Sequence, residues 1–251
     1  MQRNTFAAGV TALALVAVVV GLGGSEADTR IVADGSDAAP RGAVTGVVNF
    51  AGTAPAMPAI DMSDDAVCVE AHSSPVLERA VEVNGNGTLK GVFIYVKEGL
   101  DEAAQYPQPT DSVWVDQQGC RYTPNVVGVR VRQTLAIRNS DPATHNVHAT
   151  ATANRGFNIS QPVQGMVSTR SFRTPEAMVE VTCDVHGWMI AHIGVMSHPF
   201  FATTGDDGSF TIPDLPEGTY TLEAWHGQYG TQTAEVTVGA DGATTEFTFG
   251  S

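Results

Sequence analysis

The sequence predicts an all-β protein with sandwich architecture, and three observations support that fold class. After Gly42 the chain falls into short runs in which apolar and polar residues alternate or β-branched residues predominate. Turn pairs such as Asn84-Gly85 and Asp207-Gly208 separate these runs, and 26 Gly and 13 Pro favour many turns. Helical patterns are few and short. This combination is typical of sandwiches formed by packed β-sheets.

The expected elements can be read off these runs in chain order. The expected strands are 44–50, 89–96, 113–116, 126–131, 134–138, 177–182, 210–212, 219–224 and 233–238. Two short segments, 64–71 and 97–105, are the helix candidates.

The charge of the chain restricts its partners. There are 13 Lys and Arg against 27 Asp and Glu, which gives a formal net charge of −14. Nucleic-acid binding needs a basic face, and so does binding to an anionic membrane surface. We therefore expect no nucleic-acid partner. Hydrophobic residues make up 43% of the chain, which is enough for packed domains.

The first 27 residues have the pattern of an export signal. Arg3 precedes an apolar run over 6–22, and Ser25 and Ala27 stand where a signal peptidase prefers small residues. An uncleaved membrane anchor is the alternative. Residues 28–42 are polar, lack periodicity and are expected to form a flexible leader. We expect a periplasmic or secreted mature protein that is not inserted in a membrane.

The end of the chain carries the clearest sequence pattern. Residues 207–222 fit "DGxFxIxxLPxGxYxL", and this run resembles the carboxypeptidase regulatory-like, transthyretin-like domain. The family's opening pattern, "GxVxxxGxxP", occurs far upstream, at Gly46, Val48, Gly52 and Pro55. The resemblance implies a small Ig-like or transthyretin-like β-sandwich split between residues 43–100 and 201–251, with a second domain at 105–200 inserted in it. A tandem is the alternative, with 43–200 as one domain and the tail beside it.

A set of metal-ligating residues lies in the middle segment. Cys183, His186 and Met189 follow one another as C-x₂-H-x₂-M, and His145 and Asn146 lie upstream. One thiolate, two imidazoles and a weak thioether are the donors of a blue copper site, with Met on the long axis. Zinc can use Cys and His ligands as well, but the thioether disfavours it.

This middle segment, about residues 111–200, resembles the cupredoxin family and most closely its amicyanin-like branch. The resemblance implies a Greek-key β-sandwich with one type 1 copper, held by His145, Cys183 and His186 with Met189 as the axial ligand. It also implies that Asn146 ties the two ligand loops together, with its backbone N–H directed at the Cys183 sulfur. His186 becomes the expected electron port at the surface. The departures from the family pattern, such as Thr144 in place of a proline, remove no ligand.

The remaining cysteines and histidines have other expected roles. With Cys183 assigned to copper, Cys68 and Cys120 are the expected disulfide pair, and two separate buried thiols are the alternative. His148 is three residues beyond His145, on the opposite face of a strand, and is not expected to bind copper. The histidines without recognisable metal spacing are His72, His192, His198 and His226.

These features predict a soluble extracytoplasmic electron carrier that exchanges single electrons with a redox protein or a dehydrogenase. We expect a monomer. An enzyme is disfavoured, because the sequence contains neither G-x-S-x-G nor H-E-x-x-H and no second His-rich copper centre. The alternative is a copper-containing binding or storage module whose regulatory-like domain docks to a surface polymer or a partner enzyme.

Overall fold

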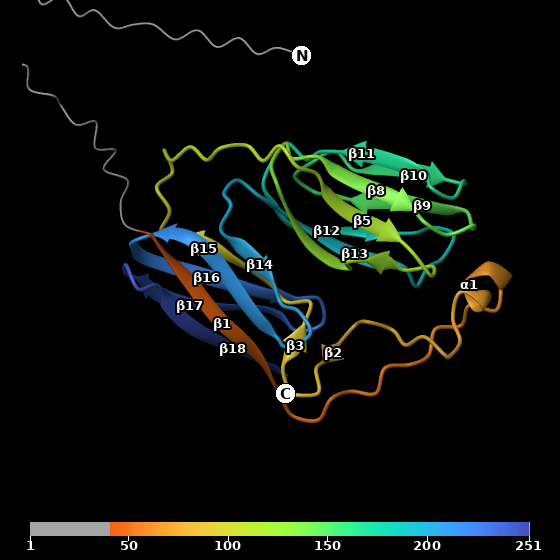
Figure 1. Ribbon diagram of the computed structural model, residues 1–251, viewed down its shortest axis with the longest axis horizontal. Helices are drawn as coiled ribbons and strands as arrows, with labels where there is room; N and C mark the ends of the chain where they lie inside the picture. Colours follow the sequence, from red (N-terminus) through yellow and green to blue (C-terminus); the bar gives the residue numbers. More distant parts are fainter. Residues whose placement is uncertain (1–40, 251) are drawn as a thin grey trace, which may run out of the picture. The chain divides into compact units, whose positions relative to one another are not determined.

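The computed structural model describes residues 41–250, and these fold almost entirely into β-strands (Figure 1). The expected signal, 1–27, and nearly all of the expected leader, 28–42, lie outside the described residues. The strands are β1 (Arg41–Ala51), β2 (Glu82–Val83), β3 (Leu89–Lys90), β4 (Phe93–Glu98), β5 (Val113–Gln117), β6 (Tyr122–Thr123), β7 (Val126–Arg130), β8 (Leu135–Asn139), β9 (His145–Thr150), β10 (Phe157–Gln161), β11 (Val167–Arg170), β12 (Glu176–Thr182), β13 (Ile190–Met196), β14 (Phe201–Thr203), β15 (Ser209–Pro216), β16 (Gly218–His226), β17 (Gly230–Val238) and β18 (Ala243–Gly250). One short helix, α1 (Ala66–Glu70), is present among them.

The first sandwich combines strands from both ends of the described chain. One of its sheets has the order β15-β1-β18 and the other the order β14-β4-β16-β17. β1 is antiparallel to β15 and parallel to β18, and β4 is antiparallel to β16. Figure 1 shows the orange β1 among the blue strands of the chain's end. These ladders exclude a tandem in which the early strands pair only with the middle segment. The domain boundaries stay a prediction.

Alternation of side chains along β1 creates the core of this sandwich. Val44 and Val48 are fully buried, and both pack in one apolar cluster with Phe210 and Ile212. Gly46 lies between the two valines, where a Cβ would come within 2.6 Å of the Phe210 ring. The glycine of the upstream sequence pattern is therefore needed so that β1 can approach Phe210.

The second sandwich contains the middle of the chain. Its sheets have the orders β10-β9-β12-β13-β7 and β11-β8-β5-β6. β9 and β12 are antiparallel neighbours, with Thr182 opposite His148. This pairing brings the start of β9 near the loop that follows β12, so that the two segments of the expected metal site meet.

The segment between β1 and β2 packs on the second sandwich. Asp65 caps α1 by accepting a hydrogen bond from the backbone N–H of Val67 at 2.9 Å. Met62 and Cys68 belong to the apolar cluster of the second sandwich, not to that of the first. Residues 43–100 were expected to belong to the split regulatory-like β-sandwich. This range therefore includes a segment that covers the core of the second sandwich.

Two facing glycines lie where the sandwiches meet. Gly128 of β7 and Gly194 of β13 are opposite each other in a parallel ladder. A Cβ on Gly128 would lie 2.4 Å from the Phe201 ring, and one on Gly194 would lie 2.5 Å from the Phe93 ring. The two phenylalanines come from β14 and β4 of the first sandwich. The absence of side chains on the glycines lets these rings approach the ladder closely.

Three expectations about elements are wrong. Residues 97–105 contain no helix, because β4 continues to Glu98 and Gly99 then turns the chain with a φ of 101°. The expected strand 89–96 is divided into β3 and β4 at Gly91, whose φ is 73°. The last strand is β18 and not the strand that ends at Val238, because buried Phe247 and Phe249 alternate along it. Within residues 41–250, no helix is long and apolar enough to span a membrane.

Candidate metal centre

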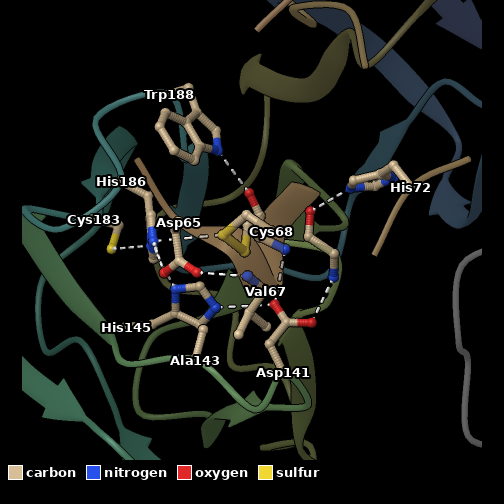
Figure 2. The surroundings of a disulfide bond; sticks show 12 residues. Asp65, Val67, Cys68, His72, Asp141, Ala143, His145, Cys183, His186 and Trp188 are labelled. Atoms are coloured by element: carbon tan, nitrogen blue, oxygen red, sulfur yellow. Dashed lines mark hydrogen bonds and ion pairs between the residues drawn. A yellow bond between two sulfur atoms is a disulfide. The ribbon is translucent and has the colours of Figure 1, made fainter. Parts of the chain in front are cut away.

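Three buried side chains direct a donor atom into one small space (Figure 2). The Nδ1 atoms of His145 and His186 are 2.9 Å apart. The Sγ atom of Cys183 is 3.9 Å from Nδ1 of His186, and the three donor atoms all lie within 4.8 Å of one another. The side chains are at most 2% exposed. Two ligands of one metal about 2 Å from it are separated by roughly 3–4 Å, so these separations suit a shared ion.

The fold fixes this convergence through a ladder and a tight loop. His145 is the first residue of β9, and Cys183 directly follows β12, the neighbour of β9. The loop that follows closes on itself: the N–H of Met189 donates to the carbonyl of His186 at 2.9 Å. The N–H of Cys183 donates to the carbonyl of Met189 at 3.2 Å. The three expected ligand residues of the loop, Cys183, His186 and Met189, are therefore held by backbone hydrogen bonds.

Asn146 joins the two ligand segments. Its backbone N–H is 3.5 Å from the Cys183 sulfur, and its side-chain oxygen accepts from the backbone N–H of Asp184 at 2.5 Å. Its side-chain N–H donates to the Asp184 carboxylate at 2.9 Å. Tyr122 strengthens the same junction, because its hydroxyl donates to the carbonyl of Asn146 at 2.7 Å and to that of Thr182 at 3.0 Å.

Each of the two imidazoles has its far nitrogen against a carboxylate. Nε2 of His145 is 2.9 Å from Asp141, and Nε2 of His186 is 3.1 Å from Asp65 (Figure 2). Asp141 is itself fixed, since it accepts the backbone N–H groups of Gly119 and Cys120 at 2.7 and 2.8 Å. Carboxylates that orient metal-binding histidines in this way are common around metal centres.

These carboxylates determine what the centre can hold. An ionised carboxylate only accepts hydrogen bonds, so Nε2 of each ring carries its proton and Nδ1 presents a lone pair. Two lone pairs then face each other at 2.9 Å beside the Cys183 sulfur. Only a cation satisfies all three donors at once, either a proton or a metal ion. The residues present therefore fit a metal ion bound by two Nδ1 atoms and one thiolate.

The pKa values agree with an electron-rich pocket that attracts positive charge. Burial alone would lower the pKa of His145, but Asp141 and the Cys183 sulfur raise it to about 9. Burial alone would raise the pKa of the Cys183 thiol, but hydrogen bonds from His145 and from the backbone N–H of Asn146 lower it overall. A thiol with a lowered pKa is the better metal ligand, because the thiolate is the binding form.

The donor set also bears on which metal fits. Met189 is 1% exposed and packs in the same apolar cluster as Cys183. Two imidazoles, a thiolate and a thioether suit copper, whereas structural zinc prefers four strong nitrogen or sulfur donors. With Met189 as the fourth ligand, the donor set would therefore fit copper better than zinc.

The expectation that His186 reaches the surface is wrong. Its ring is 2% exposed, and Asp65 and the sulfur of Cys68 lie against its Nε2 atom, the latter at 3.5 Å. Cys68 is bonded to Cys120, with a Cα–Cα distance of 5.5 Å. The segment that covers His186 comes from the start of α1. No sequence pattern around the ligand residues indicates that this segment lies there.

Asp65 and Asp141 are the two carboxylates of the site that sequence reasoning did not identify. Only Asp141, four residues before His145, had a position that could have drawn attention.

The other histidines lie outside the centre. His148 is half-exposed and bonds through Nδ1 to Asp184 at 2.9 Å. His72 bonds the carbonyl of Gly119 at 2.8 Å, and the ring of His192 packs 4.8 Å from that of Trp225. His198 and His226 each accept a nearby backbone N–H at their Nδ1 atom. None of these five belongs to the group of converging donors.

Comparison with known proteins adds a family for the end of the chain. Residues 189–249 match the model of the carboxypeptidase regulatory-like domain. The match begins at Met189, within the ligand loop. It does not include β1, which is the central strand between β15 and β18 in the structure. No curated protein matches the sequence.

Solved structures to which the chain is similar include amicyanin, a purple cupredoxin and a copper nitrite reductase. An amicyanin variant shares 18% identity over 41% of this chain and 98% of its own, with a TM-score of 0.32. A purple cupredoxin from Nitrosopumilus maritimus shares 17% identity over 33% of this chain and 98% of its own, with a TM-score of 0.29. The copper nitrite reductase of Thermus scotoductus SA-01 shares 19% identity over 39% of this chain, with a TM-score of 0.33, and only 25% of its own length is covered. Similarity at this level carries no argument about the metal, which rests on the geometry above.

Proposed function

We propose that this chain is an extracytoplasmic type 1 copper protein that carries single electrons. The ligands are His145, Cys183 and His186, with Met189 in the axial position. The observation that supports this most strongly is the convergence of two Nδ1 atoms and a buried sulfur, with a carboxylate beside the far nitrogen of each imidazole. Copper bound there would supply reversible exchange of one electron.

The residues around the centre would keep the ligand geometry constant during that exchange. Asp141 orients His145, Asp65 orients His186, and Asn146 ties the two ligand segments together. The apolar side chains behind Cys183 exclude water. A site whose ligands are already fixed needs little rearrangement when the charge changes.

The disulfide supports a location outside the cytoplasm. Cys68 and Cys120 are joined, and disulfides persist mainly in oxidising compartments. This agrees with the export signal predicted for residues 1–27. The partner would be a redox protein, a dehydrogenase or a smaller electron donor, and the chain would act as a monomer.

A second candidate function follows from the burial of His186. Since Asp65 and the disulfide cover this ring, the route by which cupredoxins exchange electrons through their loop histidine is closed here. A copper store or a copper-containing binding module needs no such route. In that case the first sandwich would dock to a surface polymer or to a partner enzyme.

Voltammetry of the copper-loaded protein separates the two functions. A carrier gives a reversible one-electron wave with oxidation and reduction currents of equal size, and small redox dyes reduce and reoxidise it within seconds. Cys183→Ser should abolish the wave, whereas Asp111→Asn, which changes an exposed carboxylate before β5 of the same sandwich, should leave it unchanged. Copper that binds fully but shows no reversible wave would contradict the carrier and leave the store.

A further inference from the structure

A pocket of about 370 Å³ lies where the two sandwiches meet, next to the metal centre. It is lined from one side by Trp188 and His192 and from the other by Trp225 and Gly227. Binding sites for small molecules commonly have volumes of about 300–1,000 Å³. Of the four proposed ligands only Met189 lines the pocket, and the three converging donors His145, Cys183 and His186 lie outside it.

Two indole rings form its aromatic walls, and both are fixed in place. Nε1 of Trp188 donates to the carbonyl of Cys120 at 3.0 Å, which anchors this ring to the disulfide loop. Trp225 packs against His192 with ring centroids 4.8 Å apart. Rigid aromatic walls bind flat rings at a small entropic cost, because no side chain has to be immobilised.

A glycine keeps the face of Trp225 accessible. Gly227 has no side chain, and a Cβ there would lie 3.4 Å from the Trp225 ring and 3.8 Å from His192. Such contacts are ordinary van der Waals distances, so a larger residue at this position would occupy the pocket without straining the backbone. The space beside Trp225 is therefore open because this position is glycine.

The pocket also contains a cation whose charge is not neutralised by an ion pair. Among residues 41–250, half-buried Arg121 has no salt bridge, whereas the neighbouring Arg79 pairs with Glu82 at 3.7 Å and Lys90 pairs with Asp206 at 2.5 Å. The carboxylate of Glu180 lies 3.9 Å from His192. The remaining acid at the rim, Glu78, is exposed to solvent. A guanidinium that is half removed from water gains most from a bound anion.

We propose that this pocket binds a planar aromatic molecule that carries one anionic group, such as an aromatic carboxylate, sulfonate or phenolate. The ring lies against Trp188 and Trp225, and the anion pairs with Arg121. The site does not depend on copper. If the proposed function also holds, a bound molecule and the metal ligand His186 lie on opposite sides of one indole, since the rings of Trp188 and His186 are 5.1 Å apart. A small aromatic molecule could then replace a protein partner at the covered histidine.

Two dyes of similar shape test the proposal. Anilinonaphthalene sulfonate has two aromatic groups and an anion, and phenylnaphthylamine has the same aromatic groups without the anion. Each is titrated into the full chain, metal-free and copper-loaded, and dye fluorescence and tryptophan quenching are recorded. We expect saturable binding of one sulfonate dye per chain in both forms, with the neutral dye binding about tenfold more weakly.

Three variants and two controls assign the binding to the pocket. Arg121→Gln should weaken the sulfonate dye about tenfold and leave the neutral dye unchanged. Gly227→Leu should abolish binding of both dyes by filling the space, and Trp225→Leu should weaken both. Arg155→Gln and Trp114→Leu, which change exposed residues outside the pocket, should have no effect. Equal binding of the two dyes, or binding unchanged in Arg121→Gln and Gly227→Leu, would overturn the proposal. If the protein binds the dyes as expected but shows no copper spectrum, the result contradicts only the proposed function.

Discussion

At the scale of single residues, the two carboxylates behind the imidazoles determine how the centre presents its donors. Asp141 and Asp65 each accept the Nε2 proton of a ring and thereby direct the Nδ1 lone pair inward. Each carboxylate is also tied to the backbone: Asp141 accepts from Gly119 and Cys120, and Asp65 accepts from Val67. The ligand orientation is thus connected to the disulfide loop and to the start of α1.

The first prediction concerns Asp141. In Asp141→Asn the amide can turn its N–H₂ group toward Nε2, which favours the tautomer with the proton on Nδ1 and so blocks a ligand atom. Copper affinity should fall about 10–100-fold, as is usual for partners of metal-bound histidines. Competition with a chelator of known affinity measures the change. Asp111→Asn, which changes an exposed carboxylate, is the control. A copper affinity of Asp141→Asn equal to that of the unchanged protein would contradict the role assigned to Asp141.

The second prediction concerns Glu176, whose hydrogen bonds go to Thr152 and Asn154 and not to any proposed metal ligand. Burial would raise the pKa of this carboxyl, but hydrogen bonds from the backbone N–H of Thr152 and from the Asn154 side chain lower it to about 2. A lowered carboxyl pKa stabilises the fold above the ordinary value of 4.5, and this contribution is lost as the pH falls toward about 2.

Glu176→Gln should therefore lower the free energy of unfolding by about 1–2 kcal/mol at pH 7, a figure reduced to allow for the partial exposure of the group. The difference from the unchanged protein should shrink steadily as the pH is lowered from 4.5 to 2. Urea unfolding at a series of pH values measures it, with the exposed Glu235→Gln as control. A difference independent of pH would show that the carboxylate charge plays no part.

The sequence allowed site residues to be predicted where they follow a local pattern. It did not allow prediction of site residues that only the fold places next to the ligands. The spacing of Cys183, His186 and Met189 drew attention to the loop, and the structure gathers two of these donors with His145. Asp65 lies 121 positions before His186, and nothing near it signals a partner at that distance. The burial of His186 could not be predicted for the same reason.

At the scale of elements, the segment that carries α1 acts as a cover over the metal centre. It is held by the disulfide between Cys68 and Cys120 and by the hydrogen bond from His186 to Asp65. The short helix candidate at 64–71 is confirmed by α1, which Asp65 caps. The position of the helix over the metal centre depends on how the long connection from β1 packs. The local sequence does not reveal this packing.

The third prediction tests this cover. Peptide mapping without reduction should recover Cys68 linked to Cys120. The double variant Cys68→Ser, Cys120→Ser should lose up to about 4 kcal/mol of stability, as expected for a cross-link over 52 residues when native strain is ignored. It should also expose His186 to a histidine-modifying reagent in the metal-free protein. A bridge that contains Cys183 would contradict both the cover and the metal site.

At the scale of the whole molecule, the ligand loop and the second aromatic wall of the pocket belong to different sandwiches. β13 follows the ligand loop, and Phe93 of the first sandwich packs on its Gly194. Phe201 packs on Gly128 of the neighbouring β7. Strand alternation predicted the all-β class and ten of the eighteen strands in residues 41–250. The expected strands did not include β2, β6, β9, β10, β11, β13, β14 or β18. The packing of the two sandwiches was not predicted either, and β18 pairs with β1 across 199 positions of sequence.

The fourth prediction addresses this packing. Gly194→Val would place side-chain atoms where the Phe93 ring lies, since even a Cβ there would be 2.5 Å from the ring. Overpacking of this kind should lower the free energy of unfolding by about 1–3 kcal/mol. Urea denaturation gives the value, and Gly85→Ala is the control, because a Cβ at Gly85 meets no atom within 4 Å. Equal stability of the two variants would refute the close contact.

The central claim is that His145, Cys183, His186 and Met189 hold one copper ion, and the visible and electron-paramagnetic spectrum of the protein loaded with one equivalent of Cu(II) tests it most directly. We predict an intense thiolate-to-copper charge-transfer band and a paramagnetic signal with narrow copper hyperfine splitting. Cys183→Ser should abolish the band, and His148→Ala, which changes a neighbouring half-exposed histidine, should leave it nearly intact. A colourless protein at full copper occupancy would contradict the account.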